Sequence, residues 1–191
     1  IGCDATGRIS GFVFDGIFNT GAYASWGPTV ANRVPIHASG PYLTPDYRAT
    51  GLAIHTNGSP AGAFRGFGVP QSAVAQECAY DLLAEKIGMD RLAFRRLNAL
   101  KDGLATVTGQ VFETGVGIDD CFAALEPKWH IAQAAADAFN AKAAATGSKW
   151  RKGVGIASCW YGCGNTSLPN PSTMRMGITA DGRIILHQGA M

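Results

Sequence analysis

The sequence has little charge of either sign and no long hydrophobic run. Sixteen Lys and Arg residues stand against fourteen Asp and Glu residues, which leaves a net charge of +2 over 191 residues. Such a small excess, without a run of basic residues, argues against a nucleic-acid partner or an anionic membrane surface. No apolar run approaches the ~18 residues of a membrane-spanning helix. The hydrophobic fraction of 47% is that of a globular chain, either one domain or part of a larger one.

Cysteine is scarce and irregularly spaced. The five cysteines are Cys3, Cys78, Cys121, Cys159 and Cys163. An odd number without a regular framework favours free structural thiols in a reducing, cytoplasmic setting over a disulfide-linked secreted fold. Cys159 and Cys163 form a C-x3-C pair, but no other His or Cys lies close by in sequence to complete a zinc site.

Several common catalytic motifs are absent. The chain has no G-x-x-x-x-G-K-[ST], which excludes a P-loop, and no G-x-S-x-G or H-E-x-x-H. The stretch "GCGNTS" at 162–167 imitates a dinucleotide-binding fingerprint, but its third glycine is missing and a proline-containing loop follows it. The four histidines are scattered along the chain, so we expect surface or hydrogen-bonded roles for them and no metal ligation.

What is present is a mixture of strand and helix patterns. The expected strands, rich in aromatic and β-branched residues, lie within 1–24, at 49–57, at 153–161 and in a hairpin at about 172–188. The expected helices lie at about 70–87, 91–99, 118–125 and 128–145. The hairpin is indicated by Asp181-Gly182, a strong turn signal. Because strands and helices do not alternate regularly, the pattern predicts an α+β fold.

Two helices carry patterns that predict which side faces the core. In the first, Val74, Cys78 and Leu82 repeat every four residues and form an apolar row, with Leu83 and Ile87 on an adjoining row. In the next, three arginines lie largely off the apolar face and are expected on a solvated or ion-paired surface. These arginines are Arg91, Arg95 and Arg96.

The stretch "GAFRGFGVPQ" at 62–71 combines glycines, aromatic rings and a cation just before a helix. Gly66 and Gly68 allow a ligand to approach the backbone closely, and amide N–H groups before a helix favour anionic oxygens. Phe67 offers a flat apolar face to a planar ligand, and Arg65 can pair with an anion or stack on a ring. A packed turn that enters a helix explains the same residues without any ligand.

Several segments carry a resemblance to a known family. They are "AFRGFGVPQ" at 63–71, "AQECAYDLLAEKIGMDRLAFRRLNAL" at 75–100, "TGQVFE" at 108–113, "RKGVGIA" at 151–157 and "ADGRIILHQGA" at 180–190. In this order they resemble the molybdenum-binding subunit of the xanthine dehydrogenase/aldehyde oxidase family. The sequence departs from the family pattern at Val69, where glycine is usual, and at Arg91, where proline is usual.

The resemblance implies that residues 1–191 are a segment of a molybdopterin-binding domain. The family's enzymes hydroxylate a carbon of a purine, another N-heterocycle or an aldehyde with oxygen derived from water. They use a molybdenum–molybdopterin cofactor and pass electrons to iron–sulfur clusters and FAD on other domains or subunits. The family's general-base glutamate lies outside the matching segments, so we expect the chain to act with the rest of a molybdenum subunit and to be inactive alone.

The same resemblance implies roles for five residues. Phe64, Arg65 and Gly66 would contact the cofactor, with the backbone N–H of Arg65 at the oxygen ligands of the molybdenum. Phe67 is similar to the ring that packs on a planar substrate. Arg33 is reached by counting back without a gap from the motif and from "PDYR". It matches an arginine that meets the substrate's exocyclic oxygen in purine-oxidising members, although aldehyde-type relatives can also carry arginine there.

Two other interpretations remain open. The chain could be a non-catalytic folded module in which the glycine loop at 58–69 serves packing alone. It could also be a nucleotide-binding enzyme that holds phosphate at the same loop. The substrate within the class of planar heterocycles and aldehydes does not follow from these residues.

Overall fold

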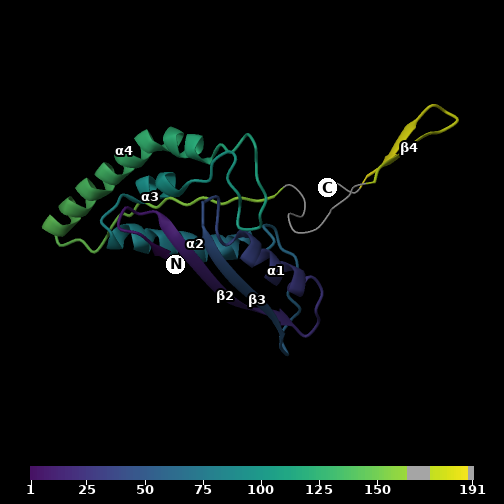
Figure 1. Cartoon of the computed structure of the whole chain (residues 1–191), viewed down its shortest axis with the longest axis horizontal. Coiled ribbons are helices and arrows are strands. Elements are labelled where there is room, and N and C mark those ends of the chain that lie inside the picture. Colours follow the sequence, from purple (N-terminus) through teal and green to yellow (C-terminus); the bar gives the residue numbers. More distant parts are fainter. Residues whose placement is uncertain (163–172, 189–191) are drawn as a thin grey trace. The chain divides into compact units, whose positions relative to one another are not determined.

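The structure, a computed structural model, describes residues 1–162 and 173–188. The chain divides into two units, Ile1–Tyr161 and Gly162–Met191, and each is described by itself. The presence of both helices and strands confirms the predicted α+β class (Figure 1). Most of the "GCGNTS" stretch, including Cys163, lies outside the described residues. Within them, no helix is long and apolar enough to cross a membrane.

The first unit contains a three-stranded sheet in the order β1-β2-β3. Its strands are β1 (Gly2–Cys3), β2 (Ile9–Gly21) and β3 (Asp46–His55). β1 and β2 pair antiparallel, whereas β2 and β3 pair parallel, with Gly11 opposite Asp46. Parallel neighbours need a crossover connection, and here helix α1 (Gly27–His37) provides it.

Helix α1 was not expected from the residues alone. Proline near its start is compatible with a helix, but Pro35 lies inside it, where proline removes a backbone hydrogen bond. Packing on the sheet compensates, because α1 approaches β3 very closely. A Cβ atom added to Gly51 would lie 2.6 Å from the Ala31 carbonyl oxygen and 3.1 Å from Cγ of Pro35. Gly51 therefore lets the helix lie directly on the strand.

Three further helices complete the first unit. They are α2 (Val69–Lys86), α3 (Arg91–Asn98) and α4 (Ile118–Ala145). Proline in the first turn of α2 agrees with the expected start of that helix. The prediction of separate helices at 118–125 and 128–145 is wrong, because α4 continues through Pro127. Phe122 and Trp129, which are buried on either side of that proline, hold both halves of α4 on the core.

The core lies where α2, α3 and α4 meet. Its buried members are Ile9, Tyr42, Tyr80, Ala84, Leu92, Phe94, Ala99, Phe122 and Trp129. The apolar row on α2 is not part of this core, since Val74 is 68% and Leu82 is 67% exposed. The buried side of α2 instead carries Gln76, Glu77 and Tyr80. Of the two predicted apolar rows, only the adjoining one, Leu83 and Ile87, packs against the core.

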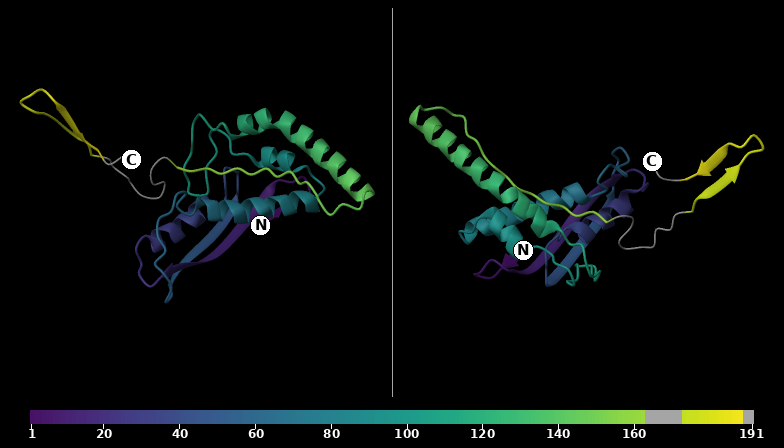
Figure 2. Two further views of the ribbon diagram at one scale, coloured as in Figure 1. Left: turned by 180° about the vertical axis from the view of Figure 1, so that it is seen from behind. Right: turned by 90° about the horizontal axis from the view of Figure 1, so that it is seen from above.

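Residues 151–162 form an extended segment without regular secondary structure, so the prediction of a strand at 153–161 is wrong. Figure 2 shows the segment running back from the end of α4 toward the side of α1. The second unit contains the hairpin of β4 (Arg175–Ile178) and β5 (Ile184–His187), which pair antiparallel. Gly182 in its turn has φ +82°, as glycine in a hairpin turn commonly does. Cysteines in the described residues are free thiols.

Candidate functional site

The loop between β3 and α2 ends in two consecutive tight turns. The Phe67 N–H donates to the Phe64 carbonyl at 2.8 Å, and the Val69 N–H donates to the Gly66 carbonyl at 2.9 Å. The φ angles are +93° at Gly66, +48° at Phe67 and +96° at Gly68. These signs match a type II turn followed by a type I′ turn. The end of the loop is therefore a defined double turn.

Both glycines of the double turn are required by local packing. A Cβ atom on Gly66 would lie 2.6 Å from Cγ of Pro70, and one on Gly68 would lie 2.8 Å from Cγ2 of Val34 in α1. Their positive φ angles add to this requirement. The fold of the loop alone thus accounts for both glycines, and a close approach of a ligand is not needed to explain them.

Phe67 occupies a conformation that a bulky residue rarely adopts. A positive φ costs an L-residue other than glycine about 1–2 kcal/mol, and Phe67 stands between two glycines in the same region. Its half-buried ring lies 6.3 Å, centroid to centroid, from the ring of Trp26 at an interplanar angle of 64°. A strained backbone that keeps an aromatic ring in place is a reason to assign that ring a function.

The start of the double turn is open to a ligand. Phe64 is 85% exposed, and Arg65 is also exposed. In the part of the chain that the structure describes, the amide N–H groups of Arg65, Gly66 and Gly68 donate to no acceptor. Amide groups at a helix N-terminus favour anionic oxygens. The double turn therefore suits a ligand that carries oxygen acceptors and a flat face.

Arg33 lies on α1, the helix on which the double turn packs. It is only 5% exposed, so it is not the ordinary surface arginine that the sequence alone would allow. His37, one helical turn later, hydrogen-bonds through Nδ1 to the Arg33 carbonyl at 3.0 Å. Burial lowers the pKa of His37 and the positive charge of Arg33 adds to this, whereas the hydrogen bond to the carbonyl opposes it. We infer a neutral ring with the proton on Nδ1, because a carbonyl can only accept.

The structure thus brings the predicted site residues onto two elements in contact. Phe64, Arg65, Gly66 and Phe67 share the double turn, and Arg33 lies on α1. Trp26, at the start of α1, contacts the ring of Phe67, and further along α1 the residues Val30 and Val34 lie against Gly68. Among the described residues, no group of three or more His, Cys, Asp or Glu side chains is placed to hold a metal ion.

A buried ion pair joins α2 and α3, and its environment differs from the one predicted for its arginine. The side chain of Arg95 is fully buried, although it was expected on the surface. Its Nε donates to Oε2 of Glu77 at 2.6 Å, and its Nη1 lies 2.8 Å from Oδ1 of Asp81. The spacing of these two acids, one helical turn apart on α2, is the only sequence signal that could have indicated a partner for Arg95.

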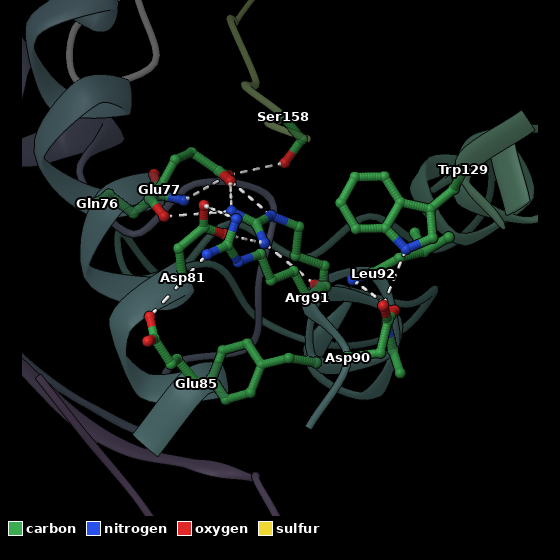
Figure 3. A network of polar contacts seen from close by, with 12 residues as sticks. Gln76, Glu77, Asp81, Glu85, Asp90, Arg91, Leu92, Trp129 and Ser158 are labelled. Atoms are coloured by element: carbon green, nitrogen blue, oxygen red, sulfur yellow. Dashed lines mark hydrogen bonds and ion pairs between the residues drawn. The ribbon is translucent and has the colours of Figure 1, made fainter. Parts of the chain in front are cut away.

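The second carboxylate oxygen of Glu77, Oε1, accepts hydrogen bonds from three side chains. Two of these donors, Gln76 and Ser158, are seen beside Glu77 in Figure 3. Tyr42 donates from its hydroxyl at 2.9 Å, Gln76 from its side-chain amide at 3.0 Å, and Ser158 from its hydroxyl at 3.2 Å. Burial, with the nearby charge of Glu77, raises the pKa of Tyr42, which keeps it a neutral donor. Through Ser158, this network ties the extended segment at 151–162 to α2.

The comparisons with known proteins agree with this geometry. The family model of the molybdopterin cofactor-binding domain matches residues 1–99, which include the sheet, α1, the double turn and α2. The chain belongs to this family. The resemblance to molybdenum hydroxylases is thereby confirmed, and molybdopterin is the cofactor for which the family is named.

The relatives are subunits or enzymes much longer than this chain. The nicotinate dehydrogenase large molybdopterin subunit of Eubacterium barkeri is 43% identical over 61% of this chain and 28% of its own length. The aldehyde oxidoreductase of Megalodesulfovibrio gigas is 35% identical over 95% of this chain and 19% of its own length. The structure of the aldehyde oxidoreductase from Desulfovibrio desulfuricans matches with a TM-score of 0.80 at 28% identity, over 96% of this chain and 19% of that one.

Proposed function

We propose that the chain acts as part of a larger molybdenum-binding subunit that hydroxylates a carbon of a purine, another N-heterocycle or an aldehyde. Membership of the cofactor-binding family and the similarity to nicotinate dehydrogenase and aldehyde oxidoreductase support this proposal. When bound, the molybdenum cofactor would supply the redox and oxygen-transfer chemistry. Iron–sulfur and FAD domains would accept the electrons, in the cytoplasm, and the chain by itself would be inactive.

The observation that carries the proposal is the double turn with its open amide groups. Phe64, Arg65 and Gly66 would hold the cofactor, with the N–H of Arg65 donating to an oxygen on the metal. Proteins commonly bind anionic oxygens with amide groups at the start of a helix. The exposure of Phe64 supports the assignment, because a bound cofactor would cover a ring that nothing covers in the described residues.

Phe67 and Arg33 would bind the substrate. The strained Phe67 would place its ring on a planar substrate, and the buried Arg33 would meet a developing negative charge on an exocyclic oxygen. A cation in a water-excluded site stabilises such charge more strongly than one in water. Both assignments are supported by the contact of the double turn with α1.

Phe67→Ala in the complete enzyme should lower kcat/KM about 10- to 100-fold while the molybdenum content stays the same. The loss reflects the removed aromatic contact, on the order of 1–3 kcal/mol. Trp26→Ala is the matched control, since it removes the same ring–ring contact but leaves Phe67 in place. Equal losses in the two variants, measured by steady-state kinetics, would mean that Phe67 only packs on Trp26.

Arg33→Met should lower kcat/KM about 10- to 100-fold on heterocycles with an exocyclic oxygen, because a hydrogen bond to a charged group contributes about 1.5–3 kcal/mol. Substrates without that oxygen should be affected much less. The comparison of a hydroxylated purine with a simple aldehyde measures the difference. A uniform loss on both substrates would contradict direct recognition of the oxygen by Arg33.

The packing of the double turn also favours a second candidate, a folded module whose glycine loop is only structural. Packing against Pro70 and α1 already explains why positions 66 and 68 are glycine. Elemental analysis of the purified complete protein separates the two candidates. Molybdenum at about one atom per subunit supports the enzyme, and its absence after expression with cofactor biosynthesis supports the module.

A further inference from the structure

One tyrosine ring lies against two neighbouring side chains of α1. The Arg33 guanidinium carbon is 5.4 Å from the centroid of the Tyr161 ring, within the range of a cation–π contact. The His37 ring stacks on the same tyrosine at 5.6 Å and 18°. Trp160 packs on His37 from the adjacent position, with centroids 4.9 Å apart. Tyr161 itself is half-exposed, whereas Arg33 and His37 are buried.

The position of Tyr161 is determined by the buried network and not by secondary structure. Its segment has no strand or helix hydrogen bonds, yet Ser158 lies three residues before it. The Ser158 hydroxyl is 2.6 Å from the Tyr42 hydroxyl and 3.2 Å from Oε1 of Glu77. Arg95 holds Glu77 in turn. Earlier in the segment, the Lys152 backbone is held by the Asn140 side chain. The Asn140 amide donates to the Lys152 carbonyl at 2.8 Å, and the Lys152 N–H donates to Oδ1 of Asn140 at 2.8 Å.

We propose that Tyr161 is a positioning residue that holds the Arg33 side chain in place for the substrate. An arginine side chain has many rotamers, and stacking on an aromatic face restricts them before any ligand binds. The neutral His37 fills the other part of the ring face without repelling the guanidinium. The consequence for catalysis rests on the substrate role proposed for Arg33, whereas the contact between Tyr161 and Arg33 can be tested without it.

The first test measures how accessible Arg33 is, without reference to activity. The complete protein is treated with phenylglyoxal, which modifies arginine side chains, and the modification of Arg33 is followed by mass spectrometry. Tyr161→Ala should accelerate it about tenfold, since a desolvated cation–π contact contributes about that factor. Tyr161→Phe keeps the ring and should leave the rate unchanged. Tyr23→Ala, which removes an exposed aromatic ring elsewhere, is the matched control.

The second test asks whether the positioning affects substrate choice. On a heterocycle with an exocyclic oxygen, Tyr161→Ala should lower kcat/KM about tenfold, and the Arg33→Met/Tyr161→Ala variant should be no worse than Arg33→Met alone. An aldehyde without that oxygen should be turned over at the same rate by Tyr161→Ala and the parent. Tyr161→Phe keeps the ring and should have the kcat/KM of the parent. If the hydroxyl were the important group, this variant would be impaired as well.

The outcomes separate this proposal from the proposed function. An unchanged rate of Arg33 modification in Tyr161→Ala, with the fold intact by circular dichroism, would overturn the positioning role. Equal losses on the heterocycle and the aldehyde would overturn it as well. If Arg33→Met leaves all kinetics unchanged while Tyr161→Ala still exposes Arg33, the substrate role of Arg33 is wrong and the contact with Tyr161 stands.

Discussion

Arg65→Pro in the complete enzyme should reduce kcat by about 10²- to 10³-fold, the usual effect of removing one donor to a charged oxygen. Proline lacks an N–H, and it is well suited to the second position of a type II turn. Arg65 has that position, because the Phe67 N–H donates to the Phe64 carbonyl and Gly66 has a positive φ. The substitution therefore removes one amide group with little change to the turn.

Arg65→Ala is the matched control for this experiment. Alanine removes the guanidinium but keeps the N–H, so molybdenum content and turnover should remain close to those of the parent. The exposure of the Arg65 side chain supports this expectation. Steady-state rates and molybdenum per subunit are measured for both variants. If proline and alanine have the same effect, the amide of Arg65 is not the contact that we propose.

Gly66→Val does not test the cofactor contact cleanly, because Gly66 is also needed for the fold of the double turn. Any side chain at Gly66 would collide with Pro70 and would need a positive φ. A loss of molybdenum in Gly66→Val would therefore report a damaged turn as well as a blocked ligand. The proline substitution at Arg65 avoids this ambiguity.

Arg95→Met should destabilise the region around α2 and α3 by about 3–5 kcal/mol, because breaking a buried ion pair leaves an unpaired charge behind. Of the two partners of Arg95, Glu77 is the more deeply buried, and it would keep the donors Tyr42, Gln76 and Ser158 but lose its cation. Native-state hydrogen exchange of the amides in α2 and α3 measures the free energy of opening in the complete protein.

Arg96→Met is the matched control for Arg95→Met. Arg96 is the next residue and also pairs with two acids, Asp119 and Glu126, but its side chain is 33% exposed. Exposed ion pairs contribute less than about 1 kcal/mol, so this variant should be nearly neutral. If both substitutions change the free energy of opening by the same amount, the burial of Arg95 does not make its ion pair more important than that of Arg96.

The sequence determined the elements whose signals are local. Local signals in the sequence mark α2, by a proline in its first turn and an apolar repeat, and the start of α3, by Asp90. Asp181-Gly182 marks the hairpin turn. The Asp90 side chain accepts from the amides of Leu92 and Ala93 at 2.9 Å each, as an N-cap does. The motif at 63–71 identified the family, which the match over residues 1–99 confirms.

Tertiary structure decided what no local pattern contains. Helix α1 exists despite Pro35 because it packs on the sheet at Gly51, and α4 runs through Pro127 because both of its halves lie on the core. Such packing contributes more to the stability of a helix than intrinsic helix propensity does, and the propensity of a single residue is a weak guide.

Contacts between distant parts of the chain also assemble the candidate site. Arg33 and His37 are one helical turn apart on α1, but Tyr161 lies far from both in sequence, and only the path of the extended segment brings its ring onto the arginine. Likewise, Arg95 is fully buried between α3 and α2 with Glu77 and Asp81 as partners, whereas Arg96, one position later, turns to Asp119 and Glu126 on α4 and stays 33% exposed. A periodic pattern assigns charged residues to the surface, and only long-range partners can offset the cost of burying a charge.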